Sequence, residues 1–329
     1  MAKKLTIIGG SGFVGTNLCN QLSSKQQDFE ILDLKMSKQF PSKCKIADVR
    51  NLESLRQAIT GDIVINLAAV HRDNVIDKME YHQTNVVGAE NIALVCSEKN
   101  IKKIVFTSTV AVYGFAEPGT DETGIINPFN EYGRTKFEAE EKFRTWMESG
   151  DNSLIILRPT VIFGEGNRGN VFNLFNQIAS GKFLMIGSGK NKKSMAYILN
   201  LVAFLELCIS SDHKYRLFNY VDTPDLTMND LVSQVRGTLI SKDGVGIRLP
   251  YFLGIFAGYI ADWITRLTGK KIPISLIRVK KFTSSSEFKS NKHLLDNFVA
   301  PYRLSDGIKR TLESEFISPD PLREIFYTE

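Results

Sequence analysis

The chain has 329 residues, of which 43% are hydrophobic and 23% charged, and a net charge of +5. This composition agrees with a globular enzyme whose length can bury a full core and is long for one simple domain. The four cysteines are scattered without a CxxC pair, which argues against a metal site and favours a reduced cytoplasmic compartment. Two lysines near the N-terminus lead into an apolar strand, so we expect no signal peptide.

The first predicted elements are a strand, a glycine-rich turn and a helix. Residues 4–8 form an apolar run typical of a buried parallel strand, and residues 13–22 have helical character. Gly9, Gly12 and Gly15 lie at the turn between them, where a missing Cβ lets backbone N–H groups approach a pyrophosphate at the helix N-terminus. The residues predicted to bind a dinucleotide here are Gly9, Gly12, Phe13 and Val14.

The second predicted strand, residues 29–33, ends in a carboxylate. Asp33 follows Gly15 by eighteen residues, where the ribose hydroxyls of an adenosine would lie. The charge of Asp33 would repel a 2′-phosphate, which favours NAD over NADP, while Lys35 nearby keeps NADP as the alternative.

Further strands are predicted at residues 63–67, 104–108 and 154–158, separated by helical stretches. This alternation predicts an α/β fold with a Rossmann-type doubly wound parallel sheet. Beyond about residue 165 the pattern changes to loops rich in glycine and asparagine, and residues 216–221 are expected to return to the sheet. We therefore expect an NAD-binding domain over 1–165, with a returning segment near 195–222, and a smaller interleaved substrate domain over 166–194 and 223–329.

Tyr132 and Lys136 are the first candidates for catalysis. A phenol with a pKa of about 10 is a poor base unless a cation stabilises its phenolate. The run from Lys136 to Lys142 predicts a helix over 130–142, in which a spacing of four puts both side chains on one face. The alternative is an ordinary surface pair, which the glycine-rich turn upstream makes the weaker interpretation.

Seven segments in chain order resemble the extended short-chain dehydrogenase/reductase superfamily, in its NAD-dependent epimerase/dehydratase branch. The matching segments are 8–15, 47–50, 66–69, 81–85, 106–114, the Tyr132/Lys136 pair and 157–164. The resemblance implies that Thr109 and Tyr132 lie at a reacting hydroxyl, and that Lys136 lowers the pKa of Tyr132 and binds the nicotinamide ribose. It also implies Asn85 as a structural support. The further residues that it implies along the cofactor are Asp48, Val49, Leu67, Ala68, Ala69 and Pro159.

Departures from the family pattern reduce the number of possible reactions. Dehydratases of the family carry Asp-Glu directly after the threonine, because eliminating water needs an additional acid and base. Here Val110 and Ala111 stand there, which favours an epimerase or a simple dehydrogenase. Val161 and Lys193 replace an asparagine and an arginine that are usual in relatives with nucleotide-linked sugars, which weakens the case for a UDP-linked substrate.

Residues 71–75, 158–170, 193–197 and 299–304 are similar to the polyprenyl-diphosphate-linked N-acetylglucosamine 4-epimerases. This narrower resemblance implies interconversion of N-acetylglucosamine and N-acetylgalactosamine on undecaprenyl diphosphate through a 4-keto intermediate, in surface-polysaccharide and O-antigen assembly. The alternatives are a UDP-sugar 4-epimerase, an NAD-dependent dehydrogenase of a hydrophobic alcohol, and a non-catalytic NAD-binding regulator. The candidate contacts of the substrate are His71, Arg72, Arg168, Lys193 and Arg278.

One region favours contact with lipid independently of the resemblance. Residues 249–261 are apolar but shorter than the roughly 20 residues that span a bilayer. Residues 242–292 carry ten lysines and arginines and three acids, a local charge of +7. We expect peripheral membrane contact through 249–281, on the cytoplasmic face of the inner membrane, with a core helix as the alternative. The basic residues lack interleaved aromatics, so nucleic acid is not expected. A homodimer is one candidate assembly.

Overall fold

The computed structural model describes residues 3–72, 75–268 and 275–328. Seven parallel strands form the central sheet in the order β11-β6-β5-β4-β1-β2-β3. Their bounds are β1 (Leu5–Ile8), β2 (Phe29–Asp33), β3 (Cys44–Ile46), β4 (Ile63–Asn66), β5 (Lys103–Thr107), β6 (Ser153–Pro159) and β11 (Tyr215–Tyr220). The predicted doubly wound parallel sheet is confirmed, and the predicted strand at 29–33 has the same bounds as β2.

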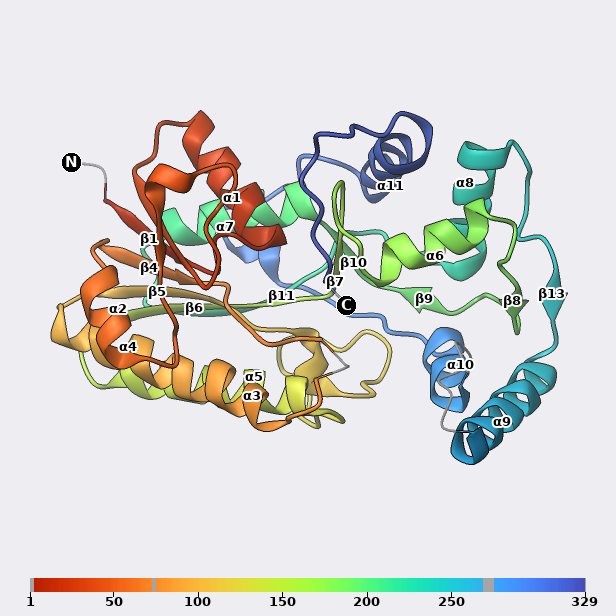
Figure 1. Cartoon of the computed structure of the whole chain (residues 1–329), viewed down its shortest axis with the longest axis horizontal. Helices are drawn as coiled ribbons and strands as arrows, with labels where there is room; N and C mark the ends of the chain where they lie inside the picture. Colours follow the sequence, from red (N-terminus) through yellow and green to blue (C-terminus); the bar gives the residue numbers. More distant parts are fainter. Residues whose placement is uncertain (1–2, 73–74, 269–274, 329) are drawn as a thin grey trace.

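Helices cover both faces of the sheet (Figure 1). One face carries α1 (Phe13–Ser24) and α7 (Ile198–Ser210), and the other carries α2 (Leu52–Ala58), α4 (Gly88–Glu98) and α5 (Glu131–Glu148). Each face has its own hydrophobic core, because the strands are buried on both sides and alternate side chains point to opposite faces. The strand at the edge, β11, pairs with β6 after more than fifty intervening residues, so the chain leaves the sheet and returns to it.

The second half of the molecule lies beyond the carboxyl ends of the strands (Figure 1). Three of its helices, α6 (Asn170–Ala179), α8 (Met228–Ile240) and α11 (Leu304–Leu312), pack with two-stranded ladders. The ladder strands are β7 (Val161–Phe163), β8 (Met185–Ile186), β9 (Lys192–Lys193), β10 (Met195–Tyr197), β12 (Leu226–Thr227) and β13 (Arg248–Leu249). Short helical turns complete the chain at α3 (Met79–Tyr81), η1 (Pro41–Lys43), η2 (His82–Val87), η3 (Val110–Tyr113), η4 (Lys292–Leu294) and η5 (Glu313–Ile317).

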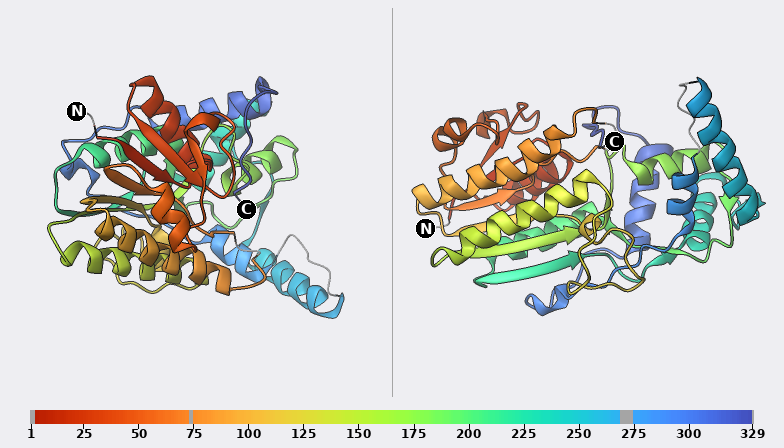
Figure 2. Two further views of the ribbon diagram at one scale, coloured as in Figure 1. Left: turned by 60° about the vertical axis from the view of Figure 1, so that its left-hand side comes forward. Right: turned by 90° about the horizontal axis from the view of Figure 1, so that it is seen from below.

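Helices α9 (Tyr251–Thr268) and α10 (Leu276–Thr283) pack against each other at the end of this half (Figures 1 and 2). The buried residues of α9 are small, namely Gly254, Gly258 and Ala261. A Cβ at Gly258 would lie 2.9 Å from the Leu276 Cα, so only glycine lets the two helices approach this closely.

Three large aromatic side chains of α9 are exposed to solvent, on the side of the helix opposite to its buried glycines. Phe252, Phe256 and Trp263 are 68%, 63% and 63% exposed. This is the reverse of an ordinary surface helix, which buries its large apolar residues. The alternative of a core helix at 249–261 is therefore wrong. Of the helices that the structure describes, none is long and apolar enough to cross a membrane.

Candidate active site

The glycine-rich turn leaves room for backbone atoms only. Gly9 has a φ of +82°, and a Cβ there would lie 2.7 Å from the Ala68 nitrogen. A Cβ at Gly15 would lie 2.5 Å from the Gly10 Cα, where α1 packs on the turn. Helix α1 begins after Gly12, and no side chain in the described part of the chain caps its first turn. Its first N–H groups are therefore available to an anion, as a dinucleotide pyrophosphate requires.

Asp33 ends β2 next to this turn. Its carboxylate accepts hydrogen bonds from the backbone N–H of Ser11 at 3.0 Å and of Lys35 at 3.2 Å. Asp48 lies after β3 and forms an ion pair with Arg50 at 2.7 Å, and this hydrogen-bonded pair lowers the pKa of Asp48. Both carboxylates lie at the sheet edge where the resemblance predicts the adenosine of NAD.

The loop after β4 forms the next wall of the site. The Asn66 side chain accepts a hydrogen bond from the Ala68 N–H at 3.1 Å, which holds the predicted cofactor segment from Leu67 to Ala69 beside Gly9. Asn85 bonds the backbone of Val70 at 2.9 and 3.1 Å and donates to the Thr135 hydroxyl at 3.0 Å. It therefore ties this loop to α5. The backbone cradle and its flanking carboxylates fit NAD.

Helix α5 brings Tyr132 to Thr109. Asn130 caps the helix by accepting from the Gly133 N–H at 2.9 Å. A Cβ at Gly133 would lie 2.5 Å from the carbonyl oxygen of Ala111, so the first turn of α5 packs directly on the segment after Thr109. Thr109 is buried two residues after β5, and its side chain lies close enough to Tyr132 to lower the pKa of that phenol. The two side chains that would meet a substrate hydroxyl are thereby brought together.

Burial shifts the pKa values of Tyr132 and Lys136. It raises the pKa of Tyr132 to about 12, and the hydrogen bond from Thr109 opposes this rise. Burial also lowers the pKa of Lys136 to about 7, and the charge of Glu140 opposes this fall. That Lys136 lowers the pKa of Tyr132 stays a prediction.

Val49 and Pro159 complete the predicted cofactor residues. Val49 is buried against Gly88, at which a Cβ would lie 2.8 Å from a Val49 methyl carbon, and Pro159 is the last residue of β6. Gly12, Phe13 and Val14 open α1.

Three predicted substrate residues already have protein partners. His71 contacts the Ala69 carbonyl through Nδ1 at 3.4 Å, and Arg72 donates to the Tyr327 carbonyl at 3.3 Å. Arg168 forms an ion pair with Glu315 and lies 4.0 Å over the Phe172 ring. Asp73 and Asn74, which belong to the segment 71–75 that resembles the lipid-linked epimerases, lie outside the described residues.

The other two predicted substrate residues lie at α10. The Lys193 ammonium donates to the carbonyls of Lys281 and Ser284, both at 2.7 Å, and burial lowers its pKa to about 8. Lys193 therefore caps the carboxyl end of α10. Arg278 lies in the first turn of α10, where its backbone N–H is capped by Ser275, and it is exposed.

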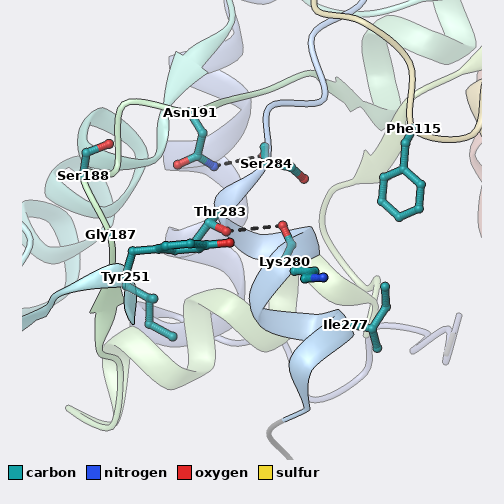
Figure 3. A pocket seen from close by; sticks show the side chains of 10 residues that line it. Phe115, Gly187, Ser188, Asn191, Tyr251, Ile277, Lys280, Thr283 and Ser284 are labelled. Carbon is teal, nitrogen blue, oxygen red and sulfur yellow. Dashed lines mark hydrogen bonds between the residues drawn. The ribbon is translucent and has the colours of Figure 1, made fainter. Parts of the chain in front are cut away.

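A pocket of about 760 Å³ opens between α10, the start of α9 and the loop after η3 (Figure 3). Its polar lining includes Lys280, Thr283 and Asn191, and its apolar walls include Phe115 and Tyr251. Asn191 donates to the Phe282 and Ser284 carbonyls, which fixes the end of α10. Sequence reasoning did not select Lys280 as a site residue, although it lies within the basic zone of 242–292.

Comparisons with known proteins agree with this geometry. Residues 5–219 match the family model described as "NAD dependent epimerase/dehydratase family". The chain is 46% identical, over 96% of both sequences, to the N-acetyl-alpha-D-glucosaminyl-diphospho-ditrans,octacis-undecaprenol 4-epimerase of Escherichia coli O157:H7. It is 26% identical to the UDP-glucose 4-epimerase of Vibrio cholerae, over 95% of this chain and 96% of that protein.

Solved structures show the same fold. The UDP-N-acetylglucosamine 4-epimerase of Bacillus cereus superposes with a TM-score of 0.73 at 19% identity, over 94% of this chain and 98% of that one. The family match also confirms the predictions of an enzyme and of NAD as its cofactor. The chain belongs to the NAD-dependent epimerase/dehydratase family.

Proposed function

We propose that this protein is an NAD-dependent 4-epimerase that interconverts N-acetylglucosamine and N-acetylgalactosamine on undecaprenyl diphosphate, in surface-polysaccharide assembly. The observation that carries the proposal is the 46% identity, over 96% of both chains, to a protein named for that activity. The relative named for a UDP-linked sugar is only 26% identical over a similar length.

The chemistry follows from the three catalytic side chains. NAD, when bound, supplies the hydride acceptor and a cationic ring that favours the Tyr132 phenolate. Tyr132 takes the proton of the sugar C4 hydroxyl as hydride leaves the same carbon, and Thr109 hydrogen-bonds the oxygen as it becomes a carbonyl. The 4-keto sugar then rotates in the site and presents its other face. Hydride returns to that face, and Tyr132 returns the proton to the oxygen. No oxidant is consumed.

The residues after Thr109 support epimerisation over dehydration. Val110 and Ala111 carry no acid or base, and the Ala111 N–H is already bonded to the Thr109 Oγ1 at 3.1 Å. Elimination of water would need a further proton donor and acceptor at this place.

Stoichiometry tests the class of reaction. We expect the NAD-loaded protein to interconvert the two N-acetylhexosamines with no added cofactor and no net change in NADH absorbance. A dehydrogenase of a hydrophobic alcohol would instead consume external NAD and accumulate NADH. Net NADH formation with no sugar interconversion would reject the epimerase assignment.

The carrier is proposed to meet the enzyme at the bilayer surface. The exposed apolar face of α9 and the exposed cations Arg278 and Lys280 on α10 together suit an interface of acyl chains and anionic headgroups. Tyr251 both begins α9 and lines the pocket, so the apolar helix is continuous with the pocket walls. Lys280 is our candidate for the diphosphate in this pocket. Lys270 and Lys271 of the basic zone lie outside the described residues.

The remaining site assignments are proposals of the same kind. The predicted cofactor residues fit NAD by their position along the sheet edge. His71, Arg72, Arg168, Lys193 and Arg278 stay our candidate contacts of the substrate, and the first four also have protein partners. The homodimer stays a prediction.

A further inference from the structure

One buried carboxylate lies behind the catalytic residues. Glu140 on α5 has no exposed surface. It accepts hydrogen bonds from Arg158 Nε at 2.8 Å, from Arg158 Nη2 at 2.5 Å and from the Ser108 hydroxyl at 2.5 Å. Arg144 lies 3.3 Å from its second oxygen. A buried charge with this many partners is fixed in one position.

The position of Glu140 relates it to all three catalytic groups. It follows Lys136 by one helical turn and Tyr132 by two, so the three lie on one face of α5. Its other partner, Ser108, directly precedes Thr109. Glu140 therefore bonds the end of the strand that carries Thr109 to the helix that carries Tyr132 and Lys136.

Glu140 also lies one helical turn from a buried ammonium, that of Lys136. The Lys136 Nζ lies 4.1 Å above the Phe106 ring, in a site where burial lowers its pKa to about 7. In the described part of the chain, Glu140 is the acidic group whose charge opposes that fall. From the loop after β4 the nearby titratable group is His71, whose pKa is lowered by burial and then by the charges of Arg72 and Lys136.

The ion pair between Glu140 and Arg158 is also held from the Arg158 side. Arg158 Nη1 donates to the Tyr113 hydroxyl at 2.7 Å, and Tyr113 donates to Asn219 at 2.8 Å. Arg158 is thus held by β6, η3 and β11 together, and its two hydrogen bonds hold the Glu140 carboxylate in place.

We propose that Glu140 is a positioning residue of the active site, which supplies the buried counter-charge for the Lys136 ammonium and fixes Thr109 relative to Tyr132. The inference rests on the proposed roles of Tyr132 and Lys136. A purely structural ion pair would stabilise the fold and leave the titration of Lys136 unchanged.

The test measures the Lys136 pKa in the NAD-loaded protein by NMR of carbon-13-labelled lysine, with the signal assigned from its loss in Lys136→Met. We expect Glu140→Gln to lower that pKa by about one unit, because removing an adjacent opposite charge disfavours the ammonium. The alkaline limb of kcat/KM on the sugar substrate should move to lower pH by a similar amount.

Two further variants separate charge from stability. Glu140→Gln leaves Arg158 buried and unpaired, which destabilises the fold, whereas Glu140→Gln/Arg158→Met removes both charges and avoids that penalty. The double variant should still show the lowered Lys136 pKa. Trp146→Leu, which truncates a buried side chain two turns further along α5, should lower stability without moving the pKa.

An unchanged Lys136 pKa in the double variant would overturn the inference. This outcome is distinct from failure of the proposed function, because the lysine titration needs no sugar. If no carrier-linked sugar is epimerised but the pKa falls as stated, the positioning role stands and the substrate assignment fails.

Discussion

The side chain of Tyr132 on α5 lies beside that of Thr109, which follows β5, close enough for Thr109 to oppose the rise in the Tyr132 pKa. This contact exists because Gly133 lets α5 pack against Ala111 at a distance that no larger residue would allow. The backbone itself therefore brings together the proposed proton acceptor and the proposed support of the developing carbonyl.

Tyr132→Phe should abolish epimerisation and leave NAD bound. The substitution removes the hydroxyl that accepts the proton and little else, since the ring keeps its packing. Turnover and bound NAD, measured on the same purified sample, check this. Turnover near that of the unaltered protein would remove Tyr132 from the role of base.

Thr109→Val should lower kcat on the order of tenfold to a hundredfold, because one hydrogen bond to the developing carbonyl is lost. Thr109 Oγ1 also caps η3 by accepting from the Ala111 N–H, so some stability should be lost too. Thr109→Ser keeps the hydroxyl and serves as the matched control, with activity close to the original. A loss of stability with unchanged kcat in the valine variant would make Thr109 a purely structural residue.

Gly9→Ala should weaken NAD binding by at least about tenfold. The added Cβ would lie 2.7 Å from the Ala68 nitrogen, at a residue with φ of +82°, so the turn must move. Gly237→Ala in α8, where a Cβ meets nothing within 4 Å, is the control and should leave binding unchanged. Titration of the cofactor-free protein with NAD measures both. Equal affinities would place the cofactor elsewhere.

Replacing Phe252 and Phe256 with Ser should reduce sedimentation of the protein with anionic vesicles and leave NAD binding intact. These side chains are 68% and 63% exposed on α9, so the change costs the fold little. Vesicle binding should also weaken with added salt, because headgroup attraction is screened within about 8 to 10 Å at physiological ionic strength.

A matched control is available elsewhere on the surface. Val299 and Leu322 are 82% and 92% exposed outside α9, and their replacement by Ser should leave vesicle binding unchanged. Equal losses in both double variants would show that α9 has no special part in binding.

Much of the sheet, and the helix that carries the proposed catalytic pair, could be predicted from the sequence. Residues 29–33 form the strand expected of them, and 154–158 lie within β6. These elements have local causes, namely apolar runs bounded by glycine or polar residues. The helical spacing of Tyr132 and Lys136 is likewise a local property, and α5 contains both residues.

Properties that depend on distant partners could not be predicted in this way. Arg168 forms an ion pair with Glu315, far along the chain, and the sequence near Arg168 does not indicate that partner. The apolar run at 249–261 is compatible with burial or exposure, and the outcome depends on which face of α9 meets α10. The pKa of Tyr132 depends on how completely the fold removes its hydroxyl from water.

The central claim is the identity of the sugar carrier, and the most direct measurement is a parallel assay of two substrates. The NAD-loaded protein is incubated with N-acetylglucosamine on undecaprenyl diphosphate in anionic vesicles and, separately, with soluble UDP-N-acetylglucosamine, and the released sugars are separated. We predict conversion to N-acetylgalactosamine on the lipid carrier, with kcat/KM at least about tenfold above that for the UDP-linked sugar. Efficient epimerisation of the UDP-linked sugar without preference for the lipid-linked form would contradict the account.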